Sequence, residues 1–407
     1  MRPSGGTMIK KLPFIVLSIL ISHNIFGFDT IASSAILIEE TTGQIIYEKS
    51  SDMPIPPASI TKLMTLDLVY KKIKSGQIKL DDYVPIPYEG TLAALPPFSS
   101  HMGLYADMRV TLDELIRGTA VMSGNDAANT LAITIAGDID SFVDRMNQEA
   151  LDLGLSETHF DDPSGLSEKN ITTARDLAKF ARIYIRNYPD SLKLYHSQHT
   201  MTFPKEDNWI FDNHPNVRVR TKQNTNLLIG AYPGADGLKT GYIDESGFNI
   251  AVTAKQGDYR LIGILLGINT DDYMNGIALR AQEAARLLDY GFKDNQFITP
   301  PIPDMSQVQV WLGDKNWISP SVNGSVKIVV PNDQKDQLRS EYYLKEELMA
   351  PFPAGTELGS LTYYIGDKEL AHFTLESPTS VNKGPWYKVA WHKILLFFRD
   401  LMKPKSI

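Results

Sequence analysis

Three short motifs in this chain combine the residue types that serine-based acyl transfer requires. The first is "PPASITKLMT", in which Ser59 and Lys62 stand three positions apart at the start of a pattern with helical spacing. Residues three apart share one face of a helix, so the two side chains are expected to be neighbours. A partly desolvated lysine can lose its proton near neutral pH and accept the serine proton, which makes the serine a nucleophile.

Two more motifs follow in chain order, Ser123-Gly124-Asn125 and Lys239-Thr240-Gly241. Each motif alone is too short to be specific, since second copies occur at Ser380 to Lys383 and at Lys74-Ser75-Gly76. Their settings separate the copies, because the second copies fall in a predicted linker and at the polar end of a predicted helix. The first motif opens a helix, the second lies between two helices, and the third lies on a strand that opens a hairpin. The ordered set, in these settings, indicates one active site.

The elements that must position these motifs indicate a mixed α/β domain. Residues 35–49 predict two short strands around Thr42-Gly43, and residues 110–185 predict several helices. Two of the helix starts resemble capping boxes, Thr111 with Glu114 and Ser141 with Asp144. From residue 249 the pattern changes to two strands and a final long helix. The helical stretch between the strands predicts a helical subdomain.

A proline-rich break, "ITPPIPDM", separates this region from a stretch of short alternating patterns that predicts a small all-β, sandwich-like domain. We therefore expect a signal peptide over residues 1–28, the domain with the motifs over 29–296, a β-rich domain over 297–383 and an amphipathic helix over 384–407.

The N-terminus indicates export. Lys10 and Lys11 precede an apolar run from Leu12 to Ile21. This run has about the length of a signal-peptide core and is too short to span a bilayer. The sequence leaves the start at Met1 or Met8 open.

The C-terminal stretch Trp386–Lys403 is apolar, aromatic and basic at once. On a helical wheel, one face collects Tyr387, Trp391, Ile394, Leu395, Phe398, Leu401 and Met402. The other face collects Lys388, His392, Arg399, Asp400 and Lys403, with Leu396 as an exception. Such a helix can lie in a membrane interface with its cations on anionic headgroups. The alternative is a helix docked on the β-rich domain, but the sequence offers no evident acidic partner for the basic face.

Composition excludes several classes of function. The chain has 407 residues, 43% of them hydrophobic, which is enough for two to three domains. A net charge of -8 repels phosphate backbones, so nucleic acid is not an expected partner. There is no cysteine, which excludes disulfides, a thiolate nucleophile and cysteine-ligated metals. The closest histidine pair, His196 and His199, is interpreted as structural, and we expect no metal and no cofactor.

The ordered motifs resemble those of the penicillin-recognising serine acyltransferases. Their flanks, "PPASITKLMT", "VMSGNDAAN", "TARDLA" and "GLKTGYIDESGFNIAVTAKQGDYRLIGILLG", are similar to the exported D-alanyl-D-alanine carboxypeptidases, the low-molecular-mass penicillin-binding proteins. The resemblance covers nearly the whole chain. It implies a penicillin-binding transpeptidase-like catalytic domain followed by the β-rich domain and the amphipathic tail.

The resemblance also implies roles for the reactive residues. Ser59 would be the acylated nucleophile and Lys62 its general base. Ser123 would relay a proton toward the leaving D-alanine, and Asn125 would hold the peptide backbone. Backbone N–H groups of Ser59 and Tyr242 would form the oxyanion hole.

The third motif would bind the terminal carboxylate of the substrate through Lys239 and Thr240. Gly241 would clear the strand edge for the peptide. Arg280, in "ALRAQEAARLLDYGF", matches the family's arginine that approaches this carboxylate. One departure is Ile243, which stands where many relatives carry a second threonine, so carboxylate binding would depend more on Thr240 and Arg280.

The implied function is a serine-type D-Ala-D-Ala carboxypeptidase that trims peptidoglycan stem pentapeptides and shapes the cell wall. Its partners would be the stem peptide, β-lactams as inhibitors, and the periplasmic face of the inner membrane. A DD-endopeptidase uses the same motifs and stays an alternative. A β-lactamase is another, although the class A glutamate context, E-x-x-L-N, does not occur in the chain. A non-catalytic wall-binding scaffold would not need the full set of reactive residues.

Overall fold

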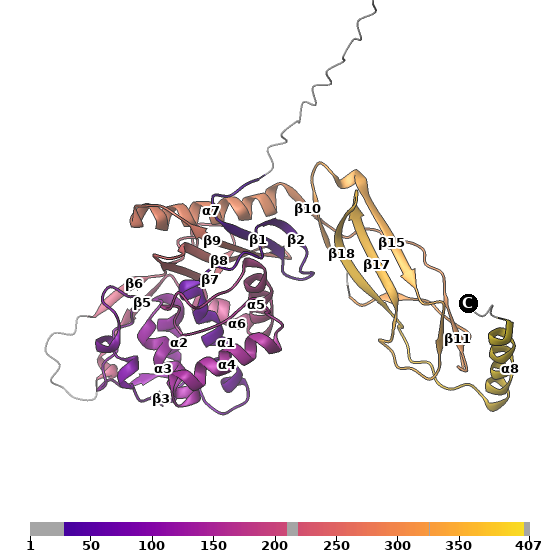
Figure 1. Cartoon of the computed structure of the whole chain (residues 1–407), viewed down its shortest axis with the longest axis horizontal. Coiled ribbons are helices and arrows are strands. Elements are labelled where there is room, and N and C mark those ends of the chain that lie inside the picture. The colour runs from indigo at the N-terminus through magenta and orange to yellow at the C-terminus, as the bar shows by residue number, and fades with distance from the viewer. Residues whose placement is uncertain (1–27, 210–218, 325, 403–407) are drawn as a thin grey trace, which may run out of the picture.

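The computed structural model describes residues 28–209, 219–324 and 326–402, so the predicted signal peptide lies outside it except for Phe28. Figure 1 shows a mixed α/β domain, in indigo to orange, joined to an elongated β domain that carries helix α8 at its far end. This arrangement confirms the predicted fold class.

One five-stranded antiparallel sheet, in the order β2-β1-β9-β8-β7, forms the frame of the first domain. Its strands are β1 (Ser34–Glu39), β2 (Ile45–Lys49), β7 (Ala235–Ile243), β8 (Gly247–Gln256) and β9 (Tyr259–Ile268). The predicted hairpins β1–β2 and β7–β8 are both present. Strand β7, which carries the third motif, is an edge strand of the sheet, so one side of its backbone is not covered by another strand of that sheet.

Helices cover both faces of this sheet (Figure 1). Helix α7 (Tyr273–Lys293) packs on one face through Ala284, Leu287 and Leu288. The other face meets the helical subdomain, whose helices are α1 (Lys62–Lys74), α2 (Leu112–Val121), α3 (Asn125–Ala136), α4 (Ile139–Asp152), α5 (Ala174–Asn187) and the short α6 (Pro189–Ser191). A 3₁₀ turn, η1 (Ala58–Thr61), precedes α1 directly.

The capping predictions have different outcomes. Thr111 and Glu114 form the predicted capping box at the start of α2. Helix α4 begins before the predicted Ser141, because the carboxylate of Asp138 accepts hydrogen bonds from the Ser141 N–H at 2.7 Å and its hydroxyl at 2.8 Å. Aspartate caps a helix as well as serine does, so the earlier residue takes the position.

Short elements complete the first domain. The strands pair as β3 (Tyr83–Val84) with β4 (Val110–Thr111) and β5 (Thr200–Phe203) with β6 (Arg220–Gln223). The turns are η2 (Tyr88–Gly90), η3 (Leu92–Ala94), the π-type η4 (Leu192–His196) and η5 (Glu206–Asn208).

The second domain is all β, as predicted, and has its own apolar clusters. A four-stranded sheet contains β13 (Ser321–Val322), β18 (Lys368–Glu376), β17 (Glu357–Ile365) and β15 (Leu338–Leu344). A three-stranded sheet contains β12 (Trp317–Ile318), β11 (Val308–Trp311) and β16 (Glu347–Met349), and η6 spans Lys335–Gln337. Strand β10 (Asn295–Ile298) pairs with β14 (Ile328–Pro331), so this pair spans the predicted boundary at residue 296.

The side chain of Gln44 joins the two domains by bonding to backbone groups, as a neighbouring strand would. Gln44, in the β1–β2 turn, donates from Nε2 to the Val329 carbonyl at 2.5 Å and accepts from the Val329 N–H at 2.7 Å. Because the amide satisfies both backbone groups of one residue, this contact is geometrically specific.

Helix α8 (Trp386–Met402) lies against the β domain along one stripe. His392 Nδ1 accepts from the Leu312 N–H at 2.9 Å, and Arg399 forms an ion pair with Glu347. The expectation that the basic face lacks an acidic partner is therefore wrong for Arg399. Leu396, the exception on the wheel, lies on this partly covered stripe.

The opposite, apolar face of α8 is exposed, with Trp391 at 58% and Phe398 at 52%. Within the described residues, no helix is both long and apolar enough to cross a membrane.

Candidate active site

The side chain of Lys62 connects three separate segments of the chain. Its Nζ donates to Ser59 Oγ at 2.8 Å, to Asn125 Oδ1 at 2.6 Å and to the Ser164 carbonyl at 2.5 Å. Ser59 lies on η1 and Lys62 is the first residue of α1, so the predicted one-turn spacing is present. Ser59 is partly exposed, whereas its neighbours Ala58 and Ile60 are buried. Ser59 is therefore accessible to solvent, whereas the lysine beside it is buried.

Two glycines hold the turn that presents Ser59. A Cβ on Gly241 would lie 2.6 Å from the Pro57 carbonyl oxygen, and one on Gly165 would lie 1.9 Å from the Ala58 carbonyl oxygen. Both distances are shorter than the 3.0 Å within which real Cβ atoms essentially never have a neighbour. Gly241 was expected to make room for substrate, and the structure gives a nearer reason, which is its contact with the backbone before Ser59.

Burial controls the electrostatics of Lys62, whose side chain is fully enclosed. Desolvation lowers the pKa of Lys62 to about 7, and the carboxylates of Asp162 and Asp126 oppose this shift. A substantial fraction of neutral amine is therefore present at neutral pH. The neutral amine is the form that can accept the Ser59 proton.

Asp162 organises the loop that supplies the Ser164 carbonyl. Its carboxylate accepts from the backbone N–H groups of Ser164 at 2.5 Å, Gly165 at 2.7 Å and Ser167 at 2.6 Å. The sequence interpretation missed this loop. The Asp-Pro-Ser-Gly run of residues 162–165 is a turn signal that marks it.

Asp126, whose charge also acts on Lys62, organises a different loop. Its buried carboxylate accepts from the N–H groups of Met102 at 2.7 Å, Gly103 at 2.7 Å and Leu104 at 3.0 Å. Asp126 directly follows the second motif, and the sequence interpretation assigned it no function.

The second motif lies between α2 and α3, as predicted. Asn125 is the first residue of α3, and its N–H donates to the Ser100 carbonyl at 3.0 Å while its side chain contacts Lys62. Ser123 is 4% exposed and has a φ of 58°, a left-handed conformation that non-glycine residues rarely adopt. Strained backbone of this kind is frequent in active sites.

Lys239 is buried on β7, and its Nζ donates to the Thr240 carbonyl at 2.9 Å. Burial, followed by the charges of Lys62 and Arg280, holds the pKa of Lys239 well below its ordinary value. These three cationic side chains therefore lie close enough to affect one another. A site with converging positive groups favours a carboxylate ligand.

Thr240 and Arg280 are joined through a residue that the sequence interpretation missed, Thr225. The hydroxyls of Thr225 and Thr240 lie 2.6 Å apart. Arg280 donates to the carbonyls of Gly241 and Thr225, each at 3.2 Å, and burial lowers the pKa of Arg280 to about 10. The buried Asn224 and Asn226 flank Thr225, and this Asn-Thr-Asn turn is the local signal.

The Tyr242 side chain is used in packing. Its hydroxyl donates to Asp244 Oδ1 at 2.6 Å, and its ring packs on Phe248 and Tyr273 at centroid distances of 4.4 and 5.0 Å. Its backbone is therefore the part of Tyr242 that is left for the expected role. Ile243 pairs with Gly247 at the end of the β7–β8 hairpin.

The two histidines considered as a metal pair have different environments. His196 is buried, donates from Nδ1 to the Leu238 carbonyl at 3.0 Å and lies 2.8 Å from the Tyr184 hydroxyl. Burial lowers the pKa of His196 to about 4, so the ring is neutral. His199 lies against Gly230 instead. Across the described segments, no three His, Asp or Glu residues gather in a way that could hold a metal ion.

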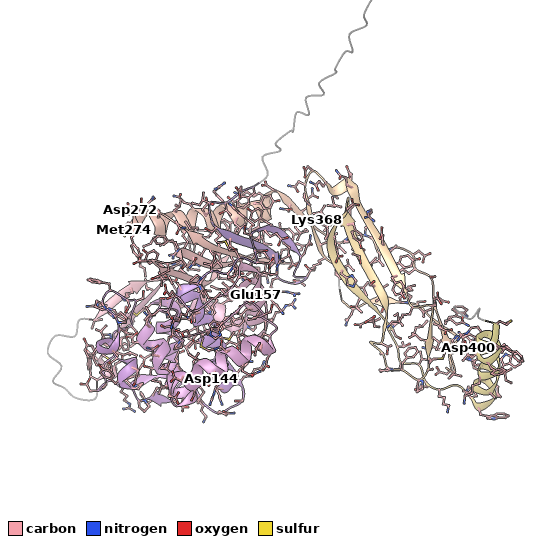
Figure 2. All side chains as sticks on the ribbon, in the orientation of Figure 1. Asp144, Glu157, Asp272, Met274, Lys368 and Asp400 are labelled. Atoms are coloured by element: carbon pink, nitrogen blue, oxygen red, sulfur yellow. The ribbon has the colours of Figure 1, made fainter. Side chains whose placement is uncertain are left out.

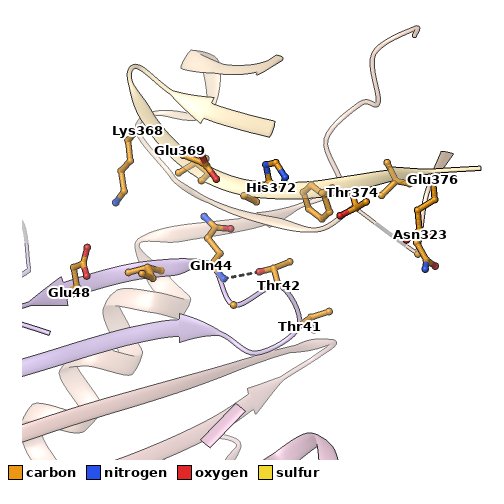
Figure 3. Close-up of a pocket in the computed structure, with 17 residues that line it drawn as sticks. Thr41, Thr42, Gln44, Glu48, Asn323, Lys368, Glu369, His372, Thr374 and Glu376 are labelled. Atoms are coloured by element: carbon orange, nitrogen blue, oxygen red, sulfur yellow. Dashed lines mark hydrogen bonds between the residues drawn. The ribbon is translucent and has the colours of Figure 1, made fainter. Parts of the chain in front are cut away.

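A separate groove of about 890 Å³ lies between the β1–β2 turn and strand β18. Figure 3 shows Thr42, Gln44 and His372 along it, and Figure 2 places Lys368, another lining residue, at the junction of the domains. The lining contains none of the predicted site residues. The groove is thus distinct from the site around Ser59.

A serine hydrogen-bonded to a buried lysine, beside an edge strand that carries a second buried lysine, is the arrangement expected of the penicillin-recognising serine enzymes. A family profile described as "D-alanyl-D-alanine carboxypeptidase" matches residues 23–270, and one described as "Penicillin-binding protein 5, C-terminal domain" matches residues 293–383. The chain belongs to the D-alanyl-D-alanine carboxypeptidase family.

Individual relatives agree with this assignment. D-alanyl-D-alanine carboxypeptidase DacC of Escherichia coli K12 is 31% identical over 375 residues, which cover 91% of this chain and 89% of that protein. Penicillin binding protein 5 from Haemophilus influenzae superposes with a TM-score of 0.75 at 28% identity, covering 88% of this chain and 99% of that one. Penicillin-Binding Protein D2 from Listeria monocytogenes, in its cefotaxime-bound form, gives a TM-score of 0.55 at 29% identity, covering 66% and 99%.

Proposed function

We propose that this chain is a serine-type D-Ala-D-Ala carboxypeptidase that removes the terminal D-alanine from peptidoglycan stem pentapeptides. The observation that carries the proposal is the buried Lys62 Nζ, with a pKa of about 7, at 2.8 Å from Ser59 Oγ. Ser59 Oγ bonds to the carbonyl carbon of the penultimate D-alanine, and the C–N bond to the terminal D-alanine breaks. Water then hydrolyses the acyl-serine and restores the hydroxyl.

The proton follows the same groups. Neutral Lys62 accepts the Ser59 proton during attack, and Ser123 relays a proton to the nitrogen of the leaving D-alanine. Asn125, which is bound to Lys62 at 2.6 Å, holds the backbone of the acyl donor. Each of these roles is part of the proposal: Lys62 and Asn125 are supported by their contacts, and Ser123 by its burial two residues before Asn125.

The terminal carboxylate defines the substrate class. Lys239, Thr240 and Arg280 converge at β7, and a carboxylate is the anion that suits such a group. The N–H groups of Ser59 and Tyr242 bind the oxyanion, and losing one such donor typically costs about 10²–10³ in rate.

The test compares D-alanine release from a diacyl-tripeptide ending in D-Ala-D-Ala by the wild-type protein, Ser59→Ala and Ser380→Ala. Ser380 belongs to the second Ser-x-x-Lys copy and is a matched control. We expect release by the wild type and Ser380→Ala and none by Ser59→Ala. Release that survives Ser59→Ala would sink the proposal.

β-lactams are the proposed inhibitors, because they carry a carboxylate and acylate the same serine. Labelled penicillin followed by intact mass measurement should give one adduct on the wild type and none on Ser59→Ala. Rapid and complete turnover of penicillin would favour a β-lactamase instead, and cleavage of crosslinked dimeric peptides would favour a DD-endopeptidase.

The proposed location is the periplasmic face of the inner membrane, after export by the signal peptide at residues 1–28. The exposed aromatic face of α8 supports a peripheral tether, with the catalytic domain over 29–296 held away from the bilayer by the β domain over 297–383. A protein that ends before residue 384 should be released from membranes and remain active. If it stays bound, the tether is wrong.

A further inference from the structure

A second cavity, of about 460 Å³, opens on the Asn125 side of the reactive serine. The cavity adjoins the site because the Asn125 N–H donates to the carbonyl of Ser100, which is one of its lining residues. Its lining includes none of the residues of the proposed mechanism. The proposed reaction therefore does not use this cavity.

The cavity has one apolar wall and one cation. Leu92, Leu95, Pro96, Pro97 and Phe98 supply the apolar wall. Phe98 is fully exposed. Covering an exposed aromatic ring with a ligand is favourable, because it removes apolar surface from water. Lys222, on β6, supplies the cation, and its Nζ donates to the His101 carbonyl at 2.7 Å. That bond uses one N–H of three and leaves two for a ligand.

Lys222, Arg220 and His101 lie near one buried acid, Asp126, on this side of the site. Burial is the main cause that lowers the pKa of Lys222, the charge of Asp126 opposes it, and the charge of Arg220 has a smaller lowering effect. Burial and then the charge of Lys222 lower the pKa of His101 as well. Asp126 is the acid that opposes these shifts, but its carboxylate already accepts the N–H groups of residues 102–104. An arriving carboxylate would add a charge-assisted bond to the ammonium of Lys222.

We propose that this cavity is a subsite for the acyl-donor part of the peptide and accepts an aliphatic side chain that ends in a carboxylate. The inference rests on the proposed function, because it needs a peptide bound at Ser59. The aliphatic stem packs on the wall from Leu92 to Phe98, and the carboxylate pairs with the ammonium of Lys222. A charge-assisted bond in a half-buried setting is stronger than a neutral one.

The experiment uses two tripeptides that end in D-Ala-D-Ala and differ only in the acyl group on the lysine Nε, which is acetyl in one and succinyl in the other. The full-length wild type should hydrolyse the succinyl peptide with a kcat/KM about tenfold higher, the gain typical of a hydrogen bond between charged groups. Lys222→Gln should bring the ratio of the two peptides to about one, and Lys222→Arg should restore it.

The matched control is Lys179→Gln. Lys179 also donates its Nζ to a single backbone carbonyl, that of Gly154 at 2.7 Å, but on helix α5. The control should keep the wild-type ratio. Equal rates for both peptides in the wild type, or a preference that persists in Lys222→Gln, would overturn the subsite.

A binding measurement separates this inference from the proposed function. Calorimetry with Ser59→Ala should show the succinyl peptide bound about tenfold more tightly than the acetyl peptide, and the double variant with Lys222→Gln should lose the difference. If Ser59→Ala shows the binding preference but the wild type releases no D-alanine, the subsite is retained and the carboxypeptidase is rejected. If the wild type releases D-alanine but Ser59→Ala binds both peptides equally, the carboxypeptidase is retained and the subsite is rejected.

Discussion

Lys62 Nζ and Ser59 Oγ lie 2.8 Å apart, and the amine is enclosed on its other sides by Asn125 Oδ1 and the Ser164 carbonyl. Because the enclosure removes water, the lysine is poised between its two protonation states at neutral pH. The contact joins the chemistry predicted from the motif to a pKa that can be measured.

The pH dependence of acylation should report this lysine. Burial lowers the pKa of Lys62 to about 7, and the neutral amine is the base in the proposed mechanism. Acylation by penicillin at limiting concentration should therefore rise about tenfold between pH 6 and pH 8 and then level off. Stopped-flow acylation rates test this, and Lys62→Arg should lose both the rate and the rise. A flat profile in the wild type would contradict the assignment of Lys62 as base.

Thr225→Val should weaken recognition of the terminal carboxylate, because it removes the hydroxyl at 2.6 Å from that of Thr240 and keeps the side-chain shape. We expect the KM for the D-Ala-D-Ala peptide to rise about fivefold to tenfold with a smaller change in kcat, and Thr225→Ser to restore it. Thr202→Val removes a similar pair, with Thr221 at 2.8 Å on β5–β6, and is the control. Equal effects of both valine variants would make Thr225 merely structural.

Gly241→Ala should disable acylation without unfolding the protein. Its Cβ would lie 2.6 Å from the Pro57 carbonyl oxygen and 3.1 Å from the Ser59 nitrogen, so the strand or the turn must move. A displacement of about 1 Å at a reacting group costs about a hundredfold in rate. Labelled penicillin measures the rate, and a thermal melt checks the fold. A variant that acylates at the wild-type rate would show that the turn is compliant.

Trp391→Glu should weaken binding to vesicles that contain anionic lipid. Trp391 is 58% exposed on the apolar face of α8. A glutamate at this position would therefore bring a negative charge directly into the membrane interface. We expect at least about a tenfold loss of partitioning in a sedimentation assay, since burial of apolar area drives this binding. Tyr343→Glu, an exposed aromatic on β15, is the matched control and should bind as the wild type does. Unchanged binding of Trp391→Glu would speak against the tether.

Asp67→Asn should stabilise the protein at high pH. Asp67 is buried on α1, its two carboxylate oxygens lack hydrogen-bond partners, and burial raises its pKa to about 7 against the opposing charge of Lys71. A raised pKa means that the folded state binds more protons than the unfolded state. The free energy of unfolding therefore falls as pH rises from about 4 to about 7, and this loss is complete above 7.

The melting temperature of Asp67→Asn should exceed that of the wild type by at least about 2 °C at pH 8, with a smaller gap at pH 5. Asp144→Asn, on the exposed face of α4 (Figure 2), is the control. A gap that does not change with pH would exclude titration of Asp67 as its cause.

Local patterns in the sequence determined several helices, strands and turns of this protein. The Ser59–Lys62 spacing, the Thr111 capping box and the β7–β8 hairpin depend on residues within a few positions of one another, so periodicity and turn chemistry predicted them. The family also follows from motif order, and the comparisons confirm it. The roles of the individual site residues and the domain boundaries stay predictions.

Only the tertiary structure decided which distant groups complete the site. The Ser164 carbonyl on Lys62, Thr225 beside Thr240, and the enclosure that lowers the pKa of Lys62 each bring together segments far apart in the chain. Glu347 on Arg399 is the same case at the tail, where the wheel predicted two faces but not the partner of one. Hydrogen bonds and desolvation depend on distance in space, and no local spacing in the sequence encodes that distance.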